Sequence, residues 1–457
     1  MDTIAALSTA PGAAGLSVIR ISGSDALAVL GRVFRSANTA HPIQMQPRKM
    51  VCGSLLGADG SEIDRPMAVW FKGPHSFTGE DVCEIHCHGS PALISLALAA
   101  IYNAGARPAK PGEFTKRAFL AGKLDLVEAE AIGELIAAET EAAVRNAAAL
   151  LGGALGRALG GVYDSVLALV ARFRAVTDYP EEDITEQEIP EMCSALTAAA
   201  GTLSALERRS LAARAFTHGV DCAIVGRPNA GKSSLMNLLC GEDRAIVTPL
   251  AGTTRDVVES RAMLGGVPLR LMDTAGIRDS QDPVEAQGIL RAKAAAEHAS
   301  LALLVLDAGI PVGEEDLRAM DAARRAEKMI IVVNKCDLPD VHYEVPAEVK
   351  STGAPVVYMS ALSGDGFDEL EQAIRTLYDS GELRFNGDVV TSARQLDAIC
   401  QSRAALLRAA DALNSGFPPD MALTDAEFAL DKLSELFGRK ASEDIVEHIF
   451  ENFCVGK

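Results

Sequence analysis

The segment DCAIVGRPNAGKSSLMNLLC, Asp221–Cys240, joins an apolar run, a glycine-rich loop and the start of a helix. Its loop from Gly226 to Ser233 fits the pattern G-x-x-x-x-G-K-[ST], which in this strand-to-helix context is typical of a phosphate-binding P-loop. Glycines let backbone N–H groups approach phosphate oxygens, and the helix N-terminus adds partial positive charge. Lys232 is expected to reach the β- and γ-phosphates, and Ser233 to bind Mg²⁺. The nucleotide contacts predicted in this loop are Asn229, Ala230, Gly231, Lys232, Ser233 and Ser234.

Two later segments indicate that the nucleotide carries guanine. The segment VVNKCD, residues 332–337, resembles the N-K-x-D element of GTPases. The Asp337 carboxylate can accept hydrogen bonds from N1–H and the 2-amino group of guanine, and adenine has neither donor, so such a site strongly rejects adenine. Asn334 and Lys335 are expected to hold the loop and cover the base. In MSALSG, residues 359–364, the residues predicted beside the base are Ser360, Ala361 and Leu362.

The segments TPLAGTTRDV (248–257) and LMDTAGIRD (271–279) fit the two switch elements. Thr254 is expected to bind Mg²⁺ through its hydroxyl, Asp273 to reach the ion through water, and the Gly276 amide to contact the γ-phosphate. Ras-like enzymes carry a water-orienting Gln after this glycine, whereas this chain has Ile277. Either hydrolysis is slow or another group orients the water. The other nucleotide contacts predicted in these segments are Thr248, Thr253, Thr274 and Ala275.

The amino-acid composition limits the classes of protein to which this chain can belong. The chain has 457 residues, 48% of them hydrophobic and 23% charged, which is typical of a globular protein. Its net charge of −19 argues against a general affinity for polyanions, so any contact with nucleic acid needs a local basic patch or a partner. Nine scattered cysteines, an acidic second residue and no long uncharged apolar run predict a soluble cytoplasmic protein with free thiols and no membrane association.

The pattern of apolar residues along the chain changes three times, which predicts an α/β plus all-α fold. Short strand-like runs reach about residue 117, and an Ala- and Leu-rich helical stretch follows. Alternating strands and helices then surround the P-loop, and the chain ends in helices. We expect an N-terminal α/β domain, a discontinuous helical domain and an inserted Ras-like P-loop G domain whose ends lie close together. The predicted boundaries are 1–117, 118–214, 215–379 and 380–457.

Motif blocks across the whole chain resemble the tRNA modification GTPase family MnmE, also called TrmE. They include LSVIRISG, GPHSFTGEDVCEIHCHGSP, RPAKPGEFTKRAFLAGKLDLVEAEAI, GRPNAGKSSLMN, AIVTPLAGTTRD, DTAGIR, NKCD and FCVGK. The resemblance implies a homodimer whose N-terminal domain dimerises and binds a tetrahydrofolate derivative. It also implies an FAD-dependent partner of the MnmG family, in a heterotetramer or larger assembly. Together they would add an aminomethyl or carboxymethylaminomethyl group to carbon 5 of the wobble uridine, U34, of tRNA.

The same resemblance implies a substitute for the missing Gln. G domains of two subunits would meet across a potassium ion, which can neutralise developing phosphate charge as a guanidinium does. Glu285 matches the family's acidic residue that is proposed to orient the attacking water, and it is the candidate catalytic residue. The positions that match the family's potassium ligands are Asn229, Thr248, Leu250 and Thr253.

For the folate site, a 5-formyl or 5,10-methylene derivative, the resemblance implies Arg20, Glu84, Lys123 and Lys457. A carboxylate suits pterin donors, and cations suit the glutamate tail. The terminal FCVGK, 453–457, is expected to fold back onto the N-terminal domain, with Phe453 and Val455 anchored in apolar surface. We expect Cys454 to pack rather than to take part in chemistry, because only Lys457 is a basic neighbour.

The segment VCEIHCHG, 82–89, contains four potential zinc ligands. Strand alternation would divide them between two faces, which argues against a metal site. One face would carry Cys83, Ile85 and Cys87, and the other Glu84, His86 and His88.

Two other functions remain open on the sequence. A regulatory GTPase of ribosome assembly, resembling the Era or EngA groups, would share the GxPNxGKS loop, but it would carry a usually basic RNA-binding domain after the G domain. The C-terminal stretch here is helical and not conspicuously basic. A folate-binding interaction module that uses GTP only as a switch is the third hypothesis.

Overall fold

The computed structural model describes residues 2–36, 45–178, 188–241, 260–272, 297, 299–338, 345–378, 385–387, 389–439, 443–451 and 453–456. These residues form two compact units. The first comprises Met1–Gly133, Leu150–Thr197 and Ala404–Lys457, and the second comprises Glu134–Ala149 and Ala198–Arg403. Each unit is described by itself, and the four predicted domain boundaries remain a prediction.

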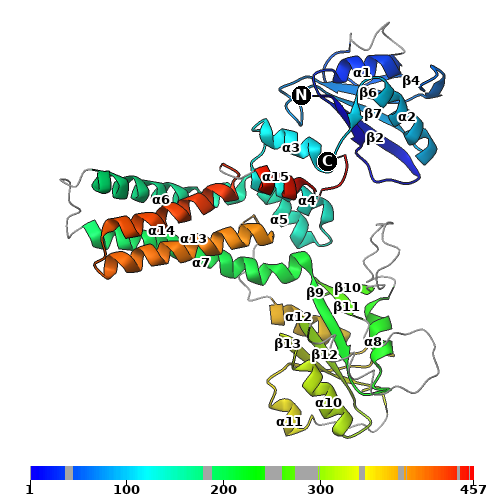
Figure 1. Cartoon of the computed structure of the whole chain (residues 1–457). Coiled ribbons are helices and arrows are strands. Elements are labelled where there is room, and N and C mark those ends of the chain that lie inside the picture. Colours follow the sequence, from blue (N-terminus) through cyan, green and yellow to red (C-terminus); the bar gives the residue numbers. More distant parts are fainter. Residues whose placement is uncertain are drawn as a thin grey trace. The chain divides into compact units, whose positions relative to one another are not determined.

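An eight-stranded sheet forms the N-terminal part of the first unit (Figure 1). Its order is β3-β4-β6-β7-β2-β1-β8, with β5 beside β4, and only the β1–β8 pair is parallel. Helices α1 (Ala26–Val33) and α2 (Pro91–Asn103) share one apolar core with the sheet. The strands are β1 Ile4–Leu7, β2 Ala14–Ser22, β3 Phe34–Ser36, β4 Val51–Leu56, β5 Glu62–Asp64, β6 Met67–Phe71, β7 Val82–Gly89 and β8 Arg107–Pro108.

Strand β7 alternates as predicted. Cys83, Ile85 and Cys87 are buried in the core under the two helices. Glu84 and His86 are half-buried on the opposite face, and His88 is exposed there. Because β2 pairs with β7 in register, Arg20 lies directly opposite Glu84. The alternation is therefore confirmed, and it places two predicted folate residues on one face.

Long helices make up the rest of the first unit. Among the described residues, one helix could cross a bilayer by its length and composition alone. It is the part of α6 from Ala154 to Ala175. Helix α6 packs along α14, and its buried residues recur every three or four positions, which is the pattern of a bundle helix. These buried residues are Leu155, Leu159, Val162, Val166, Val170 and Phe173. The helices outside the two α/β segments are α3 Glu113–Leu120, α4 Leu126–Ala137, α5 Glu141–Leu151, α6 Ala154–Asp178, α7 Glu188–His218, α13 Ala393–Asn414, α14 Pro419–Leu436 and α15 Glu443–Glu451.

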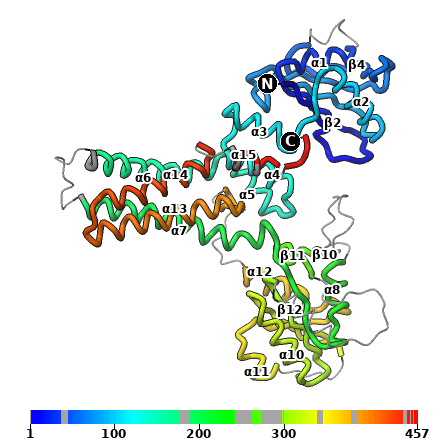
Figure 2. Tube along the Cα trace, in the orientation of Figure 1, coloured from blue at the N-terminus to red at the C-terminus, as the bar shows by residue number. Residues whose placement is uncertain are grey.

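The C-terminal tail returns to the N-terminal strands, as predicted (Figure 2). Val455 forms an antiparallel bridge with Pro111, and Ser8 Oγ donates to the Gly456 carbonyl at 3.0 Å. Phe453 packs against Phe450, with ring centroids 5.4 Å apart. The expected apolar anchoring by Val455 is wrong, because its side chain is 55% exposed and the backbone makes the contact.

The second unit contains a six-stranded sheet of order β10-β11-β9-β12-β13-β14, parallel except for β10 and β11. Helices α8 and α12 contribute to the core on one face, and α10 and α11 to the core on the other. This is a doubly wound arrangement. Its elements are β9 Val220–Val225, α8 Lys232–Leu239, β10 Ser260–Leu264, β11 Val267–Met272, β12 Leu301–Asp307, α10 Glu314–Ala323, β13 Lys328–Asn334, α11 Ala347–Lys350, β14 Val356–Tyr358 and α12 Phe367–Tyr378.

The two ends of this α/β segment lie close together, as expected for an inserted domain. The rings of Phe216, near the end of α7, and Phe385 have centroids 5.9 Å apart. The Val390 N–H donates to Ser210 Oγ at 2.9 Å, and Asn146 Nδ2 donates to the Val389 carbonyl at 3.1 Å. The returning chain is thus hydrogen-bonded to α7, from which the insert departs, and to α5.

A buried charge network ties α3 to the first strands. The Arg117 side chain is 5% exposed and forms ion pairs with Glu113, Glu80 and Asp2 at 2.9 to 3.0 Å. Arg107 also contacts Glu113, at 2.6 Å. Burial alone would raise the pKa of the Glu113 carboxyl, but hydrogen bonds from Arg107, from a backbone N–H and from Arg117 lower that pKa to about 2.

The variant Glu113→Gln is expected to lower the free energy of unfolding at pH 7 by up to ~3 kcal/mol, because the lowered pKa measures stabilisation of the carboxylate. The folded pKa lies below the ordinary value of 4.5, so this contribution is complete above 4.5 and is lost as the pH falls toward 2. Urea unfolding followed by fluorescence of Trp70, the chain's single tryptophan, measures it in this domain. The exposed Glu62→Gln is the control, and equal midpoints for both variants would contradict the prediction.

Candidate functional site

The P-loop lies between β9 and α8, at the carboxyl end of the parallel strands. Asn229 and Gly231 have φ angles of 60° and 100°, in the region that favours Asn and Gly over other residues. A Cβ at Gly231 would lie 2.0 Å from Asn334 Nδ2, and a Cβ at Gly226 would lie 2.4 Å from the Val305 carbonyl oxygen. Both positions therefore require glycine, and the loop is held tightly against β12 and β13.

Lys232 places a half-buried cation in this loop. Its Nζ donates to the carbonyls of Gly226 and Arg227 at 2.8 and 2.7 Å. Burial lowers the pKa of the Lys232 ammonium. Ser233 and Ser234 are exposed on the first turn of α8. A cation, a helix N-terminus and exposed hydroxyls in one loop fit a Mg²⁺-bound polyphosphate.

The Asn334 carboxamide joins three predicted elements. This side chain is buried, Nδ2 donates to the Ala230 carbonyl at 2.9 Å, and Oδ1 accepts from the Ala361 N–H at 2.8 Å. Lys335 Nζ donates to the Asn229 carbonyl at 2.8 Å. The structure therefore brings the P-loop, the NKCD loop and the SAL loop together, as the sequence analysis required.

The residues predicted to recognise the base lie on the two loops that meet at this junction. Asp337 is exposed on the NKCD loop, two residues after Lys335. Ser360 Oγ accepts from the N–H groups of Leu362 and Ser363 at 3.3 and 3.2 Å, which shapes the SAL turn. Leu362 is 86% exposed, so an apolar side chain remains available to cover a planar base.

A buried acid in the same site was not predicted from the sequence. Asp307 is the last residue of β12 and is 6% exposed. Its Oδ2 accepts from Lys335 Nζ at 2.8 Å and lies 3.5 Å from Arg227 Nη2. A polar residue at the carboxyl end of a buried parallel strand was the available signal, because ligand-binding residues gather at that edge.

Several predicted residues lie outside the described residues, so their positions stay predictions. They are Thr248, Leu250, Thr253, Thr254, Asp273, Thr274, Ala275, Gly276, Glu285 and Lys457.

Two predicted folate residues form one contact in the first unit. Arg20 Nη2 and Nε donate to Glu84 Oε1 at 2.8 and 3.0 Å. The Arg20 guanidinium lies 5.4 Å from the Phe77 ring centroid and 5.7 Å from that of Phe114. A half-buried ion pair with aromatic rings nearby fits a planar ligand that carries both donors and carboxylates.

The other two predicted folate residues are less directly placed. Lys123 lies beside Gly79, because a Cβ at Gly79 would meet Lys123 Cε at 3.7 Å. Gly456 precedes Lys457 and lies against β1, where an added Cβ would lie 2.0 Å from the Leu7 carbonyl oxygen. The described part of the tail therefore lies against β1, the strand that pairs with the Arg20 strand β2. Cys454 is exposed, so the expectation that it packs is wrong.

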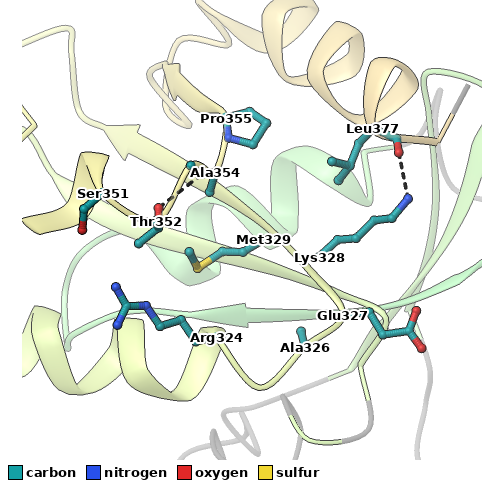
Figure 3. A pocket seen from close by; sticks show the side chains of 11 residues that line it. Arg324, Ala326, Glu327, Lys328, Met329, Ser351, Thr352, Ala354, Pro355 and Leu377 are labelled. Atoms are coloured by element: carbon teal, nitrogen blue, oxygen red, sulfur yellow. Dashed lines mark hydrogen bonds between the residues drawn. The ribbon is translucent and has the colours of Figure 1, made fainter. Parts of the chain in front are cut away.

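An open hollow of about 530 Å³ lies at the amino-terminal end of β13 and β14 in the second sheet, away from the P-loop end (Figure 3). The Lys328 ammonium in this hollow already has a partner, because its Nζ donates to the Leu377 carbonyl at 2.8 Å. None of the predicted site residues lines this hollow. Its lining consists of Arg324, Ala326, Glu327, Lys328, Met329, Ser351, Thr352, Gly353, Ala354, Pro355 and Leu377.

Comparisons with known proteins cover the whole chain. The family model for the GTP-binding protein TrmE N-terminus matches residues 3–123, and that for the MnmE helical domain matches residues 126–454. The tRNA modification GTPase MnmE of Roseiflexus sp. (strain RS-1) is 40% identical over 464 residues, covering 100% of this chain and 99% of the relative. The corresponding protein of Symbiobacterium thermophilum is 39% identical over 457 residues, with the same coverage.

A crystal structure of a variant of Aquifex aeolicus Era bound to GDP.AlF4- is 29% identical and covers 41% of this chain and 66% of that chain. Its TM-score of 0.27 is too low to support an argument. The helical-domain match and the full-length relatives are decisive by comparison. They show that the chain belongs to the MnmE family of tRNA modification GTPases.

Proposed function

We propose that this chain hydrolyses GTP in a potassium-dependent reaction and acts with an FAD-dependent MnmG-family partner on U34 of tRNA. The observation that carries the GTPase part is the Asn334 carboxamide, which assembles the phosphate loop and the guanine loops into one site. The tRNA part is supported by the full-length relatives, which are named tRNA modification GTPases. The ribosome-assembly alternative has weaker support, because these relatives match the whole chain and carry a different name.

In the proposed reaction the chain acts mainly by positioning and charge. Lys232 and the loop N–H groups neutralise the β- and γ-phosphates, and Asp337 selects guanine. Ser233 and Thr254 would hold Mg²⁺, with Asp273 acting through water. Glu285 would orient the attacking water in place of the absent Gln, and this role remains a proposal because the residue lies outside the described part of the chain.

Potassium would enter at the tip of the P-loop. The Asn229 side chain is exposed, while its carbonyl is fixed by Lys335. The amide oxygen is therefore available to a monovalent cation, together with Thr248, Leu250 and Thr253. Such an ion supplies the positive charge that an arginine finger supplies elsewhere.

The folate derivative, in its 5-formyl or 5,10-methylene form, would be held by Arg20, Glu84, Lys123 and Lys457. It supplies the one-carbon unit when bound. Glu84 would accept from pterin donors, and the cations would hold the glutamate carboxylates. The return of the tail to β1 supports this assignment, since it carries the chain end toward the Arg20 strand. The proposed assembly is a cytoplasmic homodimer that joins the flavoprotein in a heterotetramer or larger complex.

Loss of the chain is expected to leave U34 unmodified. In a strain that lacks the gene, mass spectrometry of tRNA nucleosides should show loss of the carbon-5 group, and expression of this chain should restore it. Lys232→Ala should fail to restore the modification, because the phosphate charge is lost. The exposed Asp321→Asn is the matched control and should restore it. Normal modification in the deletion strain would refute the proposed function.

Removal of the Asn229 side chain is expected to abolish potassium stimulation while nucleotide affinity is largely retained. Because Asn229 has a φ of 60°, Asn229→Ala introduces backbone strain that Asn229→Gly avoids. In K⁺, both variants should hydrolyse GTP at a rate that is lower than the wild-type rate by a factor of roughly ten or more. Each variant should have the same rate in K⁺ and in Na⁺. Equal wild-type rates in K⁺ and Na⁺ would remove the potassium assignment.

Displacement of the tail is expected to weaken folate binding without altering the guanine site. Gly456 has a φ of 101° and no room for a Cβ, so Gly456→Ala should move Lys457 away. The Kd for 5-formyltetrahydrofolate, measured by calorimetry, should rise about tenfold, as for Lys457→Ala. Cys454→Ala, at an exposed side chain, is the control. Wild-type affinity in Gly456→Ala would contradict the proposed role of the tail.

A further inference from the structure

Asp307 is a buried carboxylate at which three segments of the nucleotide site meet. Its Oδ1 accepts from the Gly309 N–H at 2.9 Å, in the loop after β12. Its Oδ2 accepts from Lys335 Nζ at 2.8 Å, in the NKCD loop, and lies 3.5 Å from Arg227 Nη2, in the P-loop. Burial alone would raise the pKa of Asp307, but Lys335, the Gly309 N–H and Arg227 lower it below its ordinary value. The carboxylate is therefore ionised at neutral pH.

Lys335 needs this support because its backbone is strained. It has a φ of 68°, a left-handed conformation that is unfavourable for a non-glycine residue. Two contacts hold the side chain, one with the Asn229 carbonyl and one with Asp307. Of the two, Asp307 supplies the only full charge. A charge-assisted hydrogen bond at a buried carboxylate is roughly twice as strong as a neutral one.

The strained residue lies two positions before Asp337, the residue that would read guanine. A loop held in one conformation before the ligand arrives loses less conformational entropy on binding. The second cation, Arg227, also approaches Asp316 of α10, with Nε and Oδ1 3.8 Å apart. The carboxylate of Asp307 thus connects the base-reading loop to the P-loop and, through Arg227, toward α10.

We propose that Asp307 is a positioning residue for guanine nucleotide: by holding Lys335 it fixes the NKCD loop against the P-loop and slows nucleotide release. This inference rests on the proposed binding of GTP. It assigns to Asp307 no contact with the phosphates, so nucleotide that is already bound and saturating should be hydrolysed at the normal rate. The expected signature is weaker binding with an unchanged kcat.

The test is Asp307→Asn in the full-length chain, which keeps the side-chain shape and the acceptor for Gly309 but removes the charge. Release of a fluorescent GDP analogue, followed by stopped-flow, should be about tenfold faster than in wild type. The kcat at saturating GTP should stay within twofold. Asp321→Asn, which removes an exposed carboxylate of α10, is the matched control and should release the analogue at the wild-type rate.

A double-mutant cycle separates positioning from a general structural role. If Asp307 acts through Lys335, adding Asp307→Asn to the variant Lys335→Met should increase the release rate less than twofold. An equal factor in both backgrounds, or an unchanged rate in the single variant, would overturn the inference. Failure of the wild-type chain to bind the analogue at all would instead refute the proposed GTP binding.

Asp307→Glu provides a second variant if Asp307→Asn does not fold. It keeps the charge but moves the carboxylate by one methylene, so it should accelerate release several-fold. Wild-type release in Asp307→Glu would also overturn the inference, because the position of the carboxylate would not matter.

Discussion

The Asn334 carboxamide is the contact on which the guanine site depends. A buried amide is expensive to leave without partners, and here both of its polar atoms are used, by Ala230 and by Ala361. The contact also dictates the sequence of the P-loop, because Gly231 lies so close to Nδ2 that a Cβ has no room. One side chain at the end of β13 thus holds together the P-loop and the SAL loop, the segments predicted to bind the phosphates and the base.

The first unit also relies on close approach of a glycine, together with strand register. Register between β2 and β7 sets Arg20 opposite Glu84, and the guanidinium lies near the rings of Phe77 and Phe114. Close approach of Gly456 to β1 fixes the end of the tail. Neither device needs a large apolar contact, which explains how a tail with an exposed Val455 still returns to a defined place.

The sequence alone predicted those parts of the site whose function depends on a fixed spacing of residue types. The P-loop, the NKCD loop and the SAL loop were recognisable because each has a fixed order of residue types, and strand alternation correctly placed Glu84 and Cys83 on opposite faces. Asp307 was not recognised, because a single acid after a buried strand has no motif until its partners are seen. The tail was predicted to return and Phe453 to pack, but Val455 and Cys454 were assigned wrongly, since a backbone bridge such as that of Val455 leaves no mark in residue type.

Asn229 connects the proposed potassium site to the guanine loop. Its side chain is the proposed ligand of the ion, and its carbonyl accepts from Lys335, whose ammonium is also bound by Asp307. An ion that orders the P-loop tip therefore favours the arrangement in which Lys335 is held. By thermodynamic linkage, guanine nucleotide must then favour the ion by the same factor. The residue proposed to bind the potassium ion would in this way be coupled to base recognition through a single peptide unit.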